Sequence, residues 1–215
     1  MRYRLIHRVG TMFGTATVAF ATALLAAAPA SAAEQAINYD CQATTGFGNT
    51  PASFERTVDA TAPETVAVGD EFTVSLSSAP ATVPTTAAGL PVNSVRNFRA
   101  TYPVPAHTTL VSASLSGGEG LGGEPVVSVA GSSVIVTLDS TIPGGATYTM
   151  PTLTLTLQAV EEGTVEVQLG GTSYADPGLF FITQVDLLGS ALDAWTSCFP
   201  SPNPVLASTT ITPAA

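Results

Sequence analysis

The amino-acid sequence predicts an all-β protein that folds as an antiparallel β-sandwich. Three observations support this prediction. Apolar and polar residues alternate along most of the chain, glycine and proline interrupt that alternation at short intervals, and no long segment has a helical period. Alternation with a period of two indicates strands that bury one face. Many short strands separated by turn residues favour a sandwich of two sheets.

The strand candidates follow one another along the chain, and most are short. The clearest has Leu153, Leu155 and Leu157 on one face and threonines on the other. Valines on both sides of Gly131 predict a β-hairpin. In chain order, strands are expected over residues 37–43, 54–60, 71–76, 94–102, 108–115, 127–130, 134–138, 152–157, 164–169, 179–184 and 205–212.

The remaining segments are expected to be loops. Residues 80–91 and 117–123 have the composition of long connections between strands. Residues 185–194 have a weak helical pattern that Gly189 interrupts, so a loop with one turn is expected there.

A basic start, an apolar alanine-rich stretch over residues 11–28 and small residues before Ala33 form a secretory leader. An uncleaved membrane anchor is the alternative, because about 18 apolar residues can just span a bilayer. The small-residue site favours cleavage. We therefore expect a signal peptide over residues 1–32 and a single domain over residues 33–215, secreted or held in the cell envelope. No transmembrane segment is expected after the leader.

The chain is acidic, with a formal charge of −10. Loss of the leader leaves three arginines and no lysine against 16 acidic residues, a charge near −13. Such a surface repels phosphate backbones and anionic lipid head groups, so binding to nucleic acid or to an anionic membrane is disfavoured. A solvated acidic surface without a specific partner is the ordinary explanation of this charge.

Cys41 and Cys198 lie near the two ends of the expected mature chain. In a secreted protein two cysteines indicate one disulfide bond. Closing so long a loop removes roughly 5 kcal/mol of unfolded-state entropy. Metal ligation is the weaker alternative, since two separated cysteines without a neighbouring histidine do not complete a tetrahedral site.

Residues at the two ends resemble a known group of proteins. Tyr39-Asp40-Cys41 opens the domain, residues 62–70 read Ala-Pro-Glu-Thr-Val-Ala-Val-Gly-Asp, and Cys198 precedes a final hydrophobic strand that ends at Ile211. These features resemble secreted actinobacterial proteins that carry an immunoglobulin-like domain of unknown function. The resemblance implies an immunoglobulin-like sandwich, export and a disulfide. It implies no catalytic residue.

The sequence has no recognisable catalytic motif. His107 is the only histidine after the leader, and a Gly-x-Ser-x-Gly motif is absent. A lone histidine where a strand begins is usually a surface or packing residue. Asp176, Asp186 and Asp193 match no ion-binding loop and are expected to be exposed turn residues. We expect no enzyme activity, no cofactor and no metal site.

Gly118, Gly120 and Gly123 match the dinucleotide-binding pattern Gly-x-Gly-x-x-Gly only formally. A dinucleotide site needs a helix that begins at this point, so that its amides meet the phosphates. Glu119 and Glu124 would repel phosphate, and strand-like valines follow. A flexible hairpin loop is expected instead.

Aromatic residues gather in the last quarter of the chain. Trp195 lies three residues before Cys198, and packing of its indole on the disulfide in the core is the favoured interpretation. A platform that binds sugar or lipid is the alternative. Phe180 and Phe181 are adjacent, so on a strand one of them points away from the core. Phe180, Phe181 and Trp195 are therefore the candidate contact patch.

Two hypotheses of function remain. The first is a non-catalytic envelope module that binds a wall polymer, a lipid or another exported protein. It predicts an exposed aromatic patch near Phe180 or Trp195 and no buried cluster of ionisable groups. The second is a secreted hydrolase with a site around His107. It predicts a hydroxyl and a carboxylate within hydrogen-bond distance of that histidine. The first hypothesis is favoured.

Overall fold

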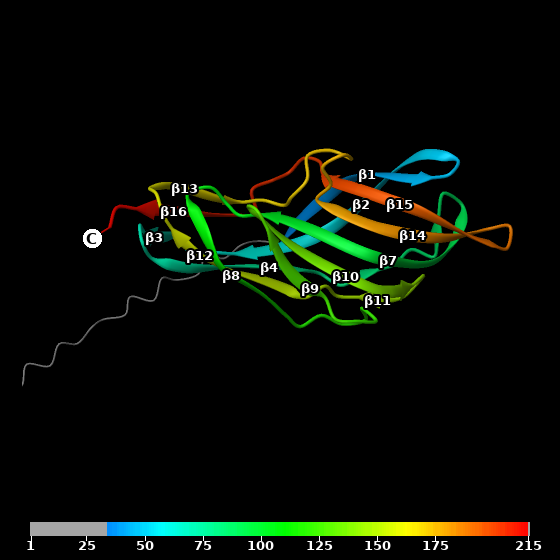
Figure 1. The fold of residues 1–215 in the computed structure, drawn as a ribbon, viewed down its shortest axis with the longest axis horizontal. Coiled ribbons are helices and arrows are strands. Elements are labelled where there is room, and N and C mark those ends of the chain that lie inside the picture. Colours follow the sequence, from blue (N-terminus) through cyan, green and yellow to red (C-terminus); the bar gives the residue numbers. More distant parts are fainter. Residues whose placement is uncertain (1–33, 215) are drawn as a thin grey trace, which may run out of the picture.

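The computed structural model describes residues 34–214 (Figure 1). Every regular element in this part of the chain is a strand. The strands are β1 (Gln35–Thr45), β2 (Gly48–Thr61), β3 (Thr65–Ala67), β4 (Glu71–Ser78), β5 (Ala81–Thr82), β6 (Thr86–Ala87), β7 (Leu90–Pro103), β8 (Thr108–Ser116), β9 (Val126–Ala130), β10 (Ser133–Pro143), β11 (Thr147–Tyr148), β12 (Thr152–Ala159), β13 (Gly163–Val167), β14 (Leu179–Leu187), β15 (Ser190–Pro200) and β16 (Ala207–Thr212). The expected leader, residues 1–32, lies outside the described residues.

The main sheet runs through ten strands in the order β8-β12-β4-β2-β1-β15-β14-β7-β10-β9, and β6 is added beside β7. All its pairings are antiparallel. The sheet folds over so that its two halves enclose one core, and its edge strands β8 and β9 approach each other. The predicted antiparallel β-sandwich with one disulfide is confirmed.

Alternation explains why these residues form these strands. In β12 the three leucines at positions 153, 155 and 157 are buried, and the threonines between them are only partly covered. In β4, Phe72, Val74 and Leu76 face them from the neighbouring strand in the same way. The hairpin around Gly131 joins β9 to β10, as its sequence predicts. Burial of these apolar faces is the main stabilising term of the fold.

A second, three-stranded sheet lies at the end of the molecule where the chain terminates (Figure 1). In this sheet β16 pairs with β13 in the antiparallel sense and with β3 in the parallel sense. Thr209 of β16 is fully buried, and its hydroxyl donates a hydrogen bond to the Pro63 carbonyl at 2.7 Å. The last strand therefore ties the chain end to the segment before β3.

The disulfide bond joins Cys41 of β1 to Cys198 of β15. The two residues lie directly opposite each other in neighbouring strands, with their Cα atoms 4.1 Å apart. Both side chains are buried, at 1% and 0% exposure. The predicted link between the first strand and a late one is confirmed, and it lies within one sheet.

The expectation for residues 185–194 is wrong. Instead of a loop with a helical turn, this segment is the end of β14, a two-residue turn and the start of β15. Leu188 and Gly189 form the turn with φ values of 55° and 83°, and positive φ at both positions is the signature of a type I′ hairpin. Gly189 therefore marks a hairpin turn. The loop expected at residues 80–91 also contains the short strands β5 and β6.

No helix in residues 34–214 has the length and apolar character needed to span a membrane.

Removing the disulfide should lower stability without changing the fold. For C41A/C198A we expect the free energy of unfolding to fall by roughly 2–5 kcal/mol, because the bond closes a loop with a sequence separation of 157 residues. Urea unfolding of oxidised wild type and of the variant measures the difference. Reduced wild type is the control and should unfold close to the variant. Equal midpoints for the oxidised wild type and the variant would contradict a stabilising role.

Candidate functional site

The outer face of β14 and β15 carries the exposed tryptophan of the chain. Residues that lie opposite each other in antiparallel strands point to the same side of the sheet. Trp195 lies opposite Ile182 of β14 and Thr44 of β1. Its neighbours along the strand, Ala194 and Thr196, are buried on the core side. The indole therefore points away from the core, and Trp195 is 47% exposed.

The expectation that the indole packs on the disulfide in the core is wrong. Trp195 and Cys198 are three residues apart on one strand, β15. Successive side chains of a strand point to opposite faces, so residues an odd number of positions apart lie on opposite sides of the sheet. Since Cys198 is fully buried, Trp195 has to face outward.

Phe180 and Phe181 divide between the two faces, as adjacent strand residues must. Phe181 faces the core, where its ring centroid lies 6.3 Å from that of Phe54 and 6.2 Å from that of Phe98. Phe180 lies opposite Ser197 of β15 and therefore shares the outer face with Trp195. Of the three residues in the predicted patch, Phe180 and Trp195 belong to the outer surface and Phe181 to the core.

Two further aromatic residues extend this surface. Phe199 follows Trp195 on the same face of β15, and the ring of Tyr174 contacts it edge to face at a centroid distance of 5.2 Å. Four residues along a strand correspond to about 13 Å. Phe180 lies level with Ser197, midway between Trp195 and Phe199. We call Trp195, Phe180, Phe199 and Tyr174 the aromatic strip.

Two arginines of β7 border the aromatic strip. Arg99 lies opposite Phe180, and Arg96 lies opposite Ile182, so both arginines point outward. Simple alternation would put residues three apart on opposite faces. The pairing shifts between these two positions, where Asn97 has a φ of 53°, so the extra residue forms a β-bulge. Sequence reasoning missed both arginines because nothing in the strand pattern locates a bulge.

The two arginines differ in their partners. Arg96 forms an ion pair with Asp193 of β15, and the amide of Gln184 donates a hydrogen bond to the same carboxylate. Arg99 is exposed and has no ion pair within residues 34–214. The outer face therefore combines aromatic rings, amide and hydroxyl groups and one unpaired guanidinium.

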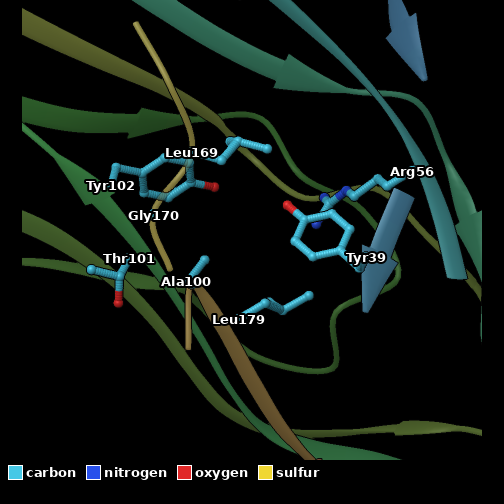
Figure 2. A pocket seen from close by; sticks show the side chains of 9 residues that line it. Tyr39, Arg56, Ala100, Thr101, Tyr102, Leu169, Gly170 and Leu179 are labelled. Atoms are coloured by element: carbon cyan, nitrogen blue, oxygen red, sulfur yellow. The ribbon is translucent and has the colours of Figure 1, made fainter. Parts of the chain in front are cut away.

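A polar cluster lies inside the sandwich, where Arg56 of β2 meets two tyrosines (Figure 2). Arg56 lies opposite the buried Ile37, so it points inward, and it donates a hydrogen bond to the Ser78 hydroxyl. Figure 2 shows the Tyr39 hydroxyl beside the guanidinium, with the Tyr102 side chain on the other side of Tyr39. The Nε atom of Arg56 is buried without a protein partner. The expectation that no buried ionisable cluster exists is wrong.

The space around this cluster is small. It measures about 10 Å³ on one side and about 20 Å³ on the other. Each space has room for about one water molecule and none for an organic ligand. Alternation along β2 could have located the cluster, because Arg56 shares the apolar face with Phe54 and Val58.

Burial raises the pKa of the Tyr39 hydroxyl well above its ordinary value of 10.0, and the neighbouring Tyr102 raises it further. Arg56 acts in the opposite direction but does not outweigh burial. Burial also raises the pKa of Tyr102. Both hydroxyls therefore stay protonated at neutral pH and act as neutral hydrogen-bonding groups.

His107 lies apart from the aromatic strip, immediately before β8. Its Nδ1 is 3.4 Å from an oxygen of the exposed Glu161, but no hydrogen bond joins the two. Its ring packs against Gly163, where an added Cβ would come within 2.9 Å of Nε2. Within residues 34–214 no hydroxyl forms a hydrogen bond with this histidine. The hydrolase hypothesis requires both a carboxylate and a hydroxyl beside His107. The structure shows the carboxylate, from Glu161, but no hydroxyl of the described residues bonded to the histidine.

The three candidate aspartates do not converge. Asp176 and Asp186 lie in or beside turns, and Asp186 accepts the Gly189 amide at 2.7 Å. Asp193 differs from the expectation, because it lies within β15 and pairs with Arg96. In the part of the chain that the structure describes, no three His, Cys, Asp or Glu residues gather as a metal site would require.

The glycine segment is a packed connection between β8 and β9, which do not pair with each other, so the expectation of a flexible hairpin loop is wrong. Gly120 has a φ of 68°, and a Cβ there would lie 2.3 Å from the Thr147 carbonyl oxygen. Glu119 forms a single β-bridge with Thr149. The glycines therefore allow close packing of backbone on backbone.

No family model and no curated protein matches the chain. One solved structure resembles it, described as a "Putative membrane anchored protein from Corynebacterium diphtheriae". The TM-score is 0.58 at 17% sequence identity, and the match covers 85% of this chain and 38% of that one. At this identity the likeness concerns the fold. The chain thus spans well under half the length of that protein.

The raised pKa of the buried Tyr39 leads to a prediction of how the free energy of unfolding changes at alkaline pH. A hydroxyl whose pKa is raised by folding adds stability below pH 10, and this stability is lost as the pH rises above that value. We therefore expect the Tyr39→Phe variant to lose less stability than wild type between neutral pH and about pH 11. Urea unfolding at both pH values measures this loss, and Tyr174→Phe, at an exposed position, is the control. Equal losses in wild type and Tyr39→Phe would contradict the prediction.

Proposed function

We propose that the protein is a secreted, non-catalytic β-sandwich module of the cell envelope that binds a wall polymer through the aromatic strip. The observation that carries this proposal is the 47% exposed Trp195 on the outer face of a sheet that also carries the half-buried Phe180 and Phe199. Exposed aromatic rings such as those of Trp195 and Tyr174 cost solubility and add nothing to the core, so a contact surface explains them best.

The chemistry between the rings supports a polysaccharide over the other envelope components. Sugar rings present apolar faces that stack on aromatic rings, and they surround those faces with hydroxyl groups. Gln42, Gln184 and Ser197 share the outer face with the rings and offer hydrogen bonds at their flanks. Arg99 adds an unpaired cation that suits acidic groups on such a polymer. The roughly 13 Å between Trp195 and Phe199 suits an extended ligand.

Three independent features support an extracellular or envelope location. The leader over residues 1–32 directs export, the disulfide suits an oxidising compartment, and the structural neighbour is described as membrane anchored. The resemblance of the chain ends to secreted actinobacterial proteins agrees with this location. The hydrolase around His107 is the weaker candidate, because the hydroxyl that it requires is missing from that site.

A binding experiment with cell-wall sacculi tests the proposal. We expect wild type to sediment with insoluble actinobacterial sacculi, and Phe180→Ser/Trp195→Ser to bind at least about tenfold more weakly, since each buried aromatic contact contributes 1.4 kcal/mol or more. Val126→Ser/Val129→Ser is the matched control, because it removes two exposed apolar side chains from β9. Absence of wild-type binding, or equal binding of the aromatic variant, would disprove the proposal.

A further inference from the structure

One end of the molecule consists of hairpin turns that carry no charge. The strand pairings place the β1–β2, β14–β15 and β6–β7 turns and the last residues of β10 at the same end of the sheet (Figure 1). The turns at this end, residues 45–48, 87–90, 143–147 and 187–190, contain no charged residue. The acidic residues closest to these turns in the sequence are Asp139 of β10, Asp186 of β14 and Asp193 of β15.

Two large apolar side chains project from this end. Phe47 lies in the β1–β2 turn and is 81% exposed, and Leu188 lies in the β14–β15 turn and is 99% exposed. They are the two most exposed large hydrophobic residues in the described chain. Figure 1 shows both turns projecting at the end of the long axis opposite the C-terminus.

The conformation of Leu188 is a second, independent observation. Its φ of 55° is unfavourable for a bulky side chain, and the first position of such a turn favours asparagine, aspartate or glycine. Leucine is therefore unfavourable here for two reasons: its bulky side chain does not suit the positive φ, and its apolar surface is exposed to water. A residue that violates two local rules without a packing contact indicates a function outside the folded chain.

We propose that Phe47 and Leu188 insert into a lipid surface made of uncharged or zwitterionic lipids. Lipid is favoured over a folded partner because the two side chains project from separate turns. A protein interface needs a continuous patch of roughly 800 Å² on each partner, whereas a lipid layer adapts to isolated projections. The net negative charge of the chain excludes an anionic surface. At this end, Asp186 caps its own turn and Asp193 is neutralised by Arg96.

The inference goes beyond wall-polymer binding and uses different turn residues, so either proposal can fail alone. The test is flotation of the purified secreted protein with phosphatidylcholine vesicles. We expect wild type to float, and Phe47→Ser/Leu188→Asn to bind about tenfold more weakly for each side chain removed. Asparagine suits the turn at position 188, so the variant should keep or raise the melting temperature of wild type. This separates lost binding from misfolding.

The matched control is Val160→Ser, which removes an exposed valine at the far end of the molecule and should float like wild type. The inference is overturned if wild type does not float, if the double variant floats equally, or if partial replacement of the lipid by phosphatidylglycerol strengthens binding. It is also overturned if the substitutions change only the oligomeric state, since a second copy would then occupy the tips.

Discussion

The pairing of β1 with β15 is the constraint on which the rest of the structure depends. In the main sheet β1 and four further strands lie on one side of this pairing, and β15, four further strands and β6 lie on the other, so it is the hydrogen-bonded seam between the two halves. The Cys41–Cys198 bond fixes its register from within the core. A slip by one residue would turn the tryptophan inward and the cysteine outward, because side chains alternate between faces.

The same seam places both candidate surfaces. On its outer face lies the aromatic strip, and at one end of its strands lie the turns with Phe47 and Leu188. A rigid sheet holds the rings of the strip in fixed positions, which limits the entropy lost when a ligand binds. Short turns, by contrast, project single side chains from that frame. One scaffold therefore supports a flat contact surface and a projecting one.

At two positions the residue type does not suit its local environment, unlike in the remainder of the fold. Arg56 points into an apolar interior with its Nε atom unpartnered by protein, and Leu188 occupies an unfavourable backbone conformation in full solvent. The first is offset by Ser78, by the two tyrosine hydroxyls nearby and by room for a water molecule on each side. No contact within the described chain offsets the unfavourable conformation and exposure of Leu188. We therefore interpret Arg56 as a structural residue and Leu188 as a residue that acts outside the folded chain.

The sequence by itself determined the all-β class, the strands other than β15 and the short β3, β5, β6 and β11, and the partners of the disulfide, because these follow from local alternation and from the number of cysteines. It also determined that one of Phe180 and Phe181 faces outward. Only the tertiary structure decided that Trp195 leaves the core, that a bulge at Asn97 brings Arg96 and Arg99 to one face, and that distant charge-free turns meet at one end. The reason is physical. Alternation specifies that a strand has two faces, whereas pairing register and bulges, which depend on residues far apart in the chain, specify which face is buried and which residues share it.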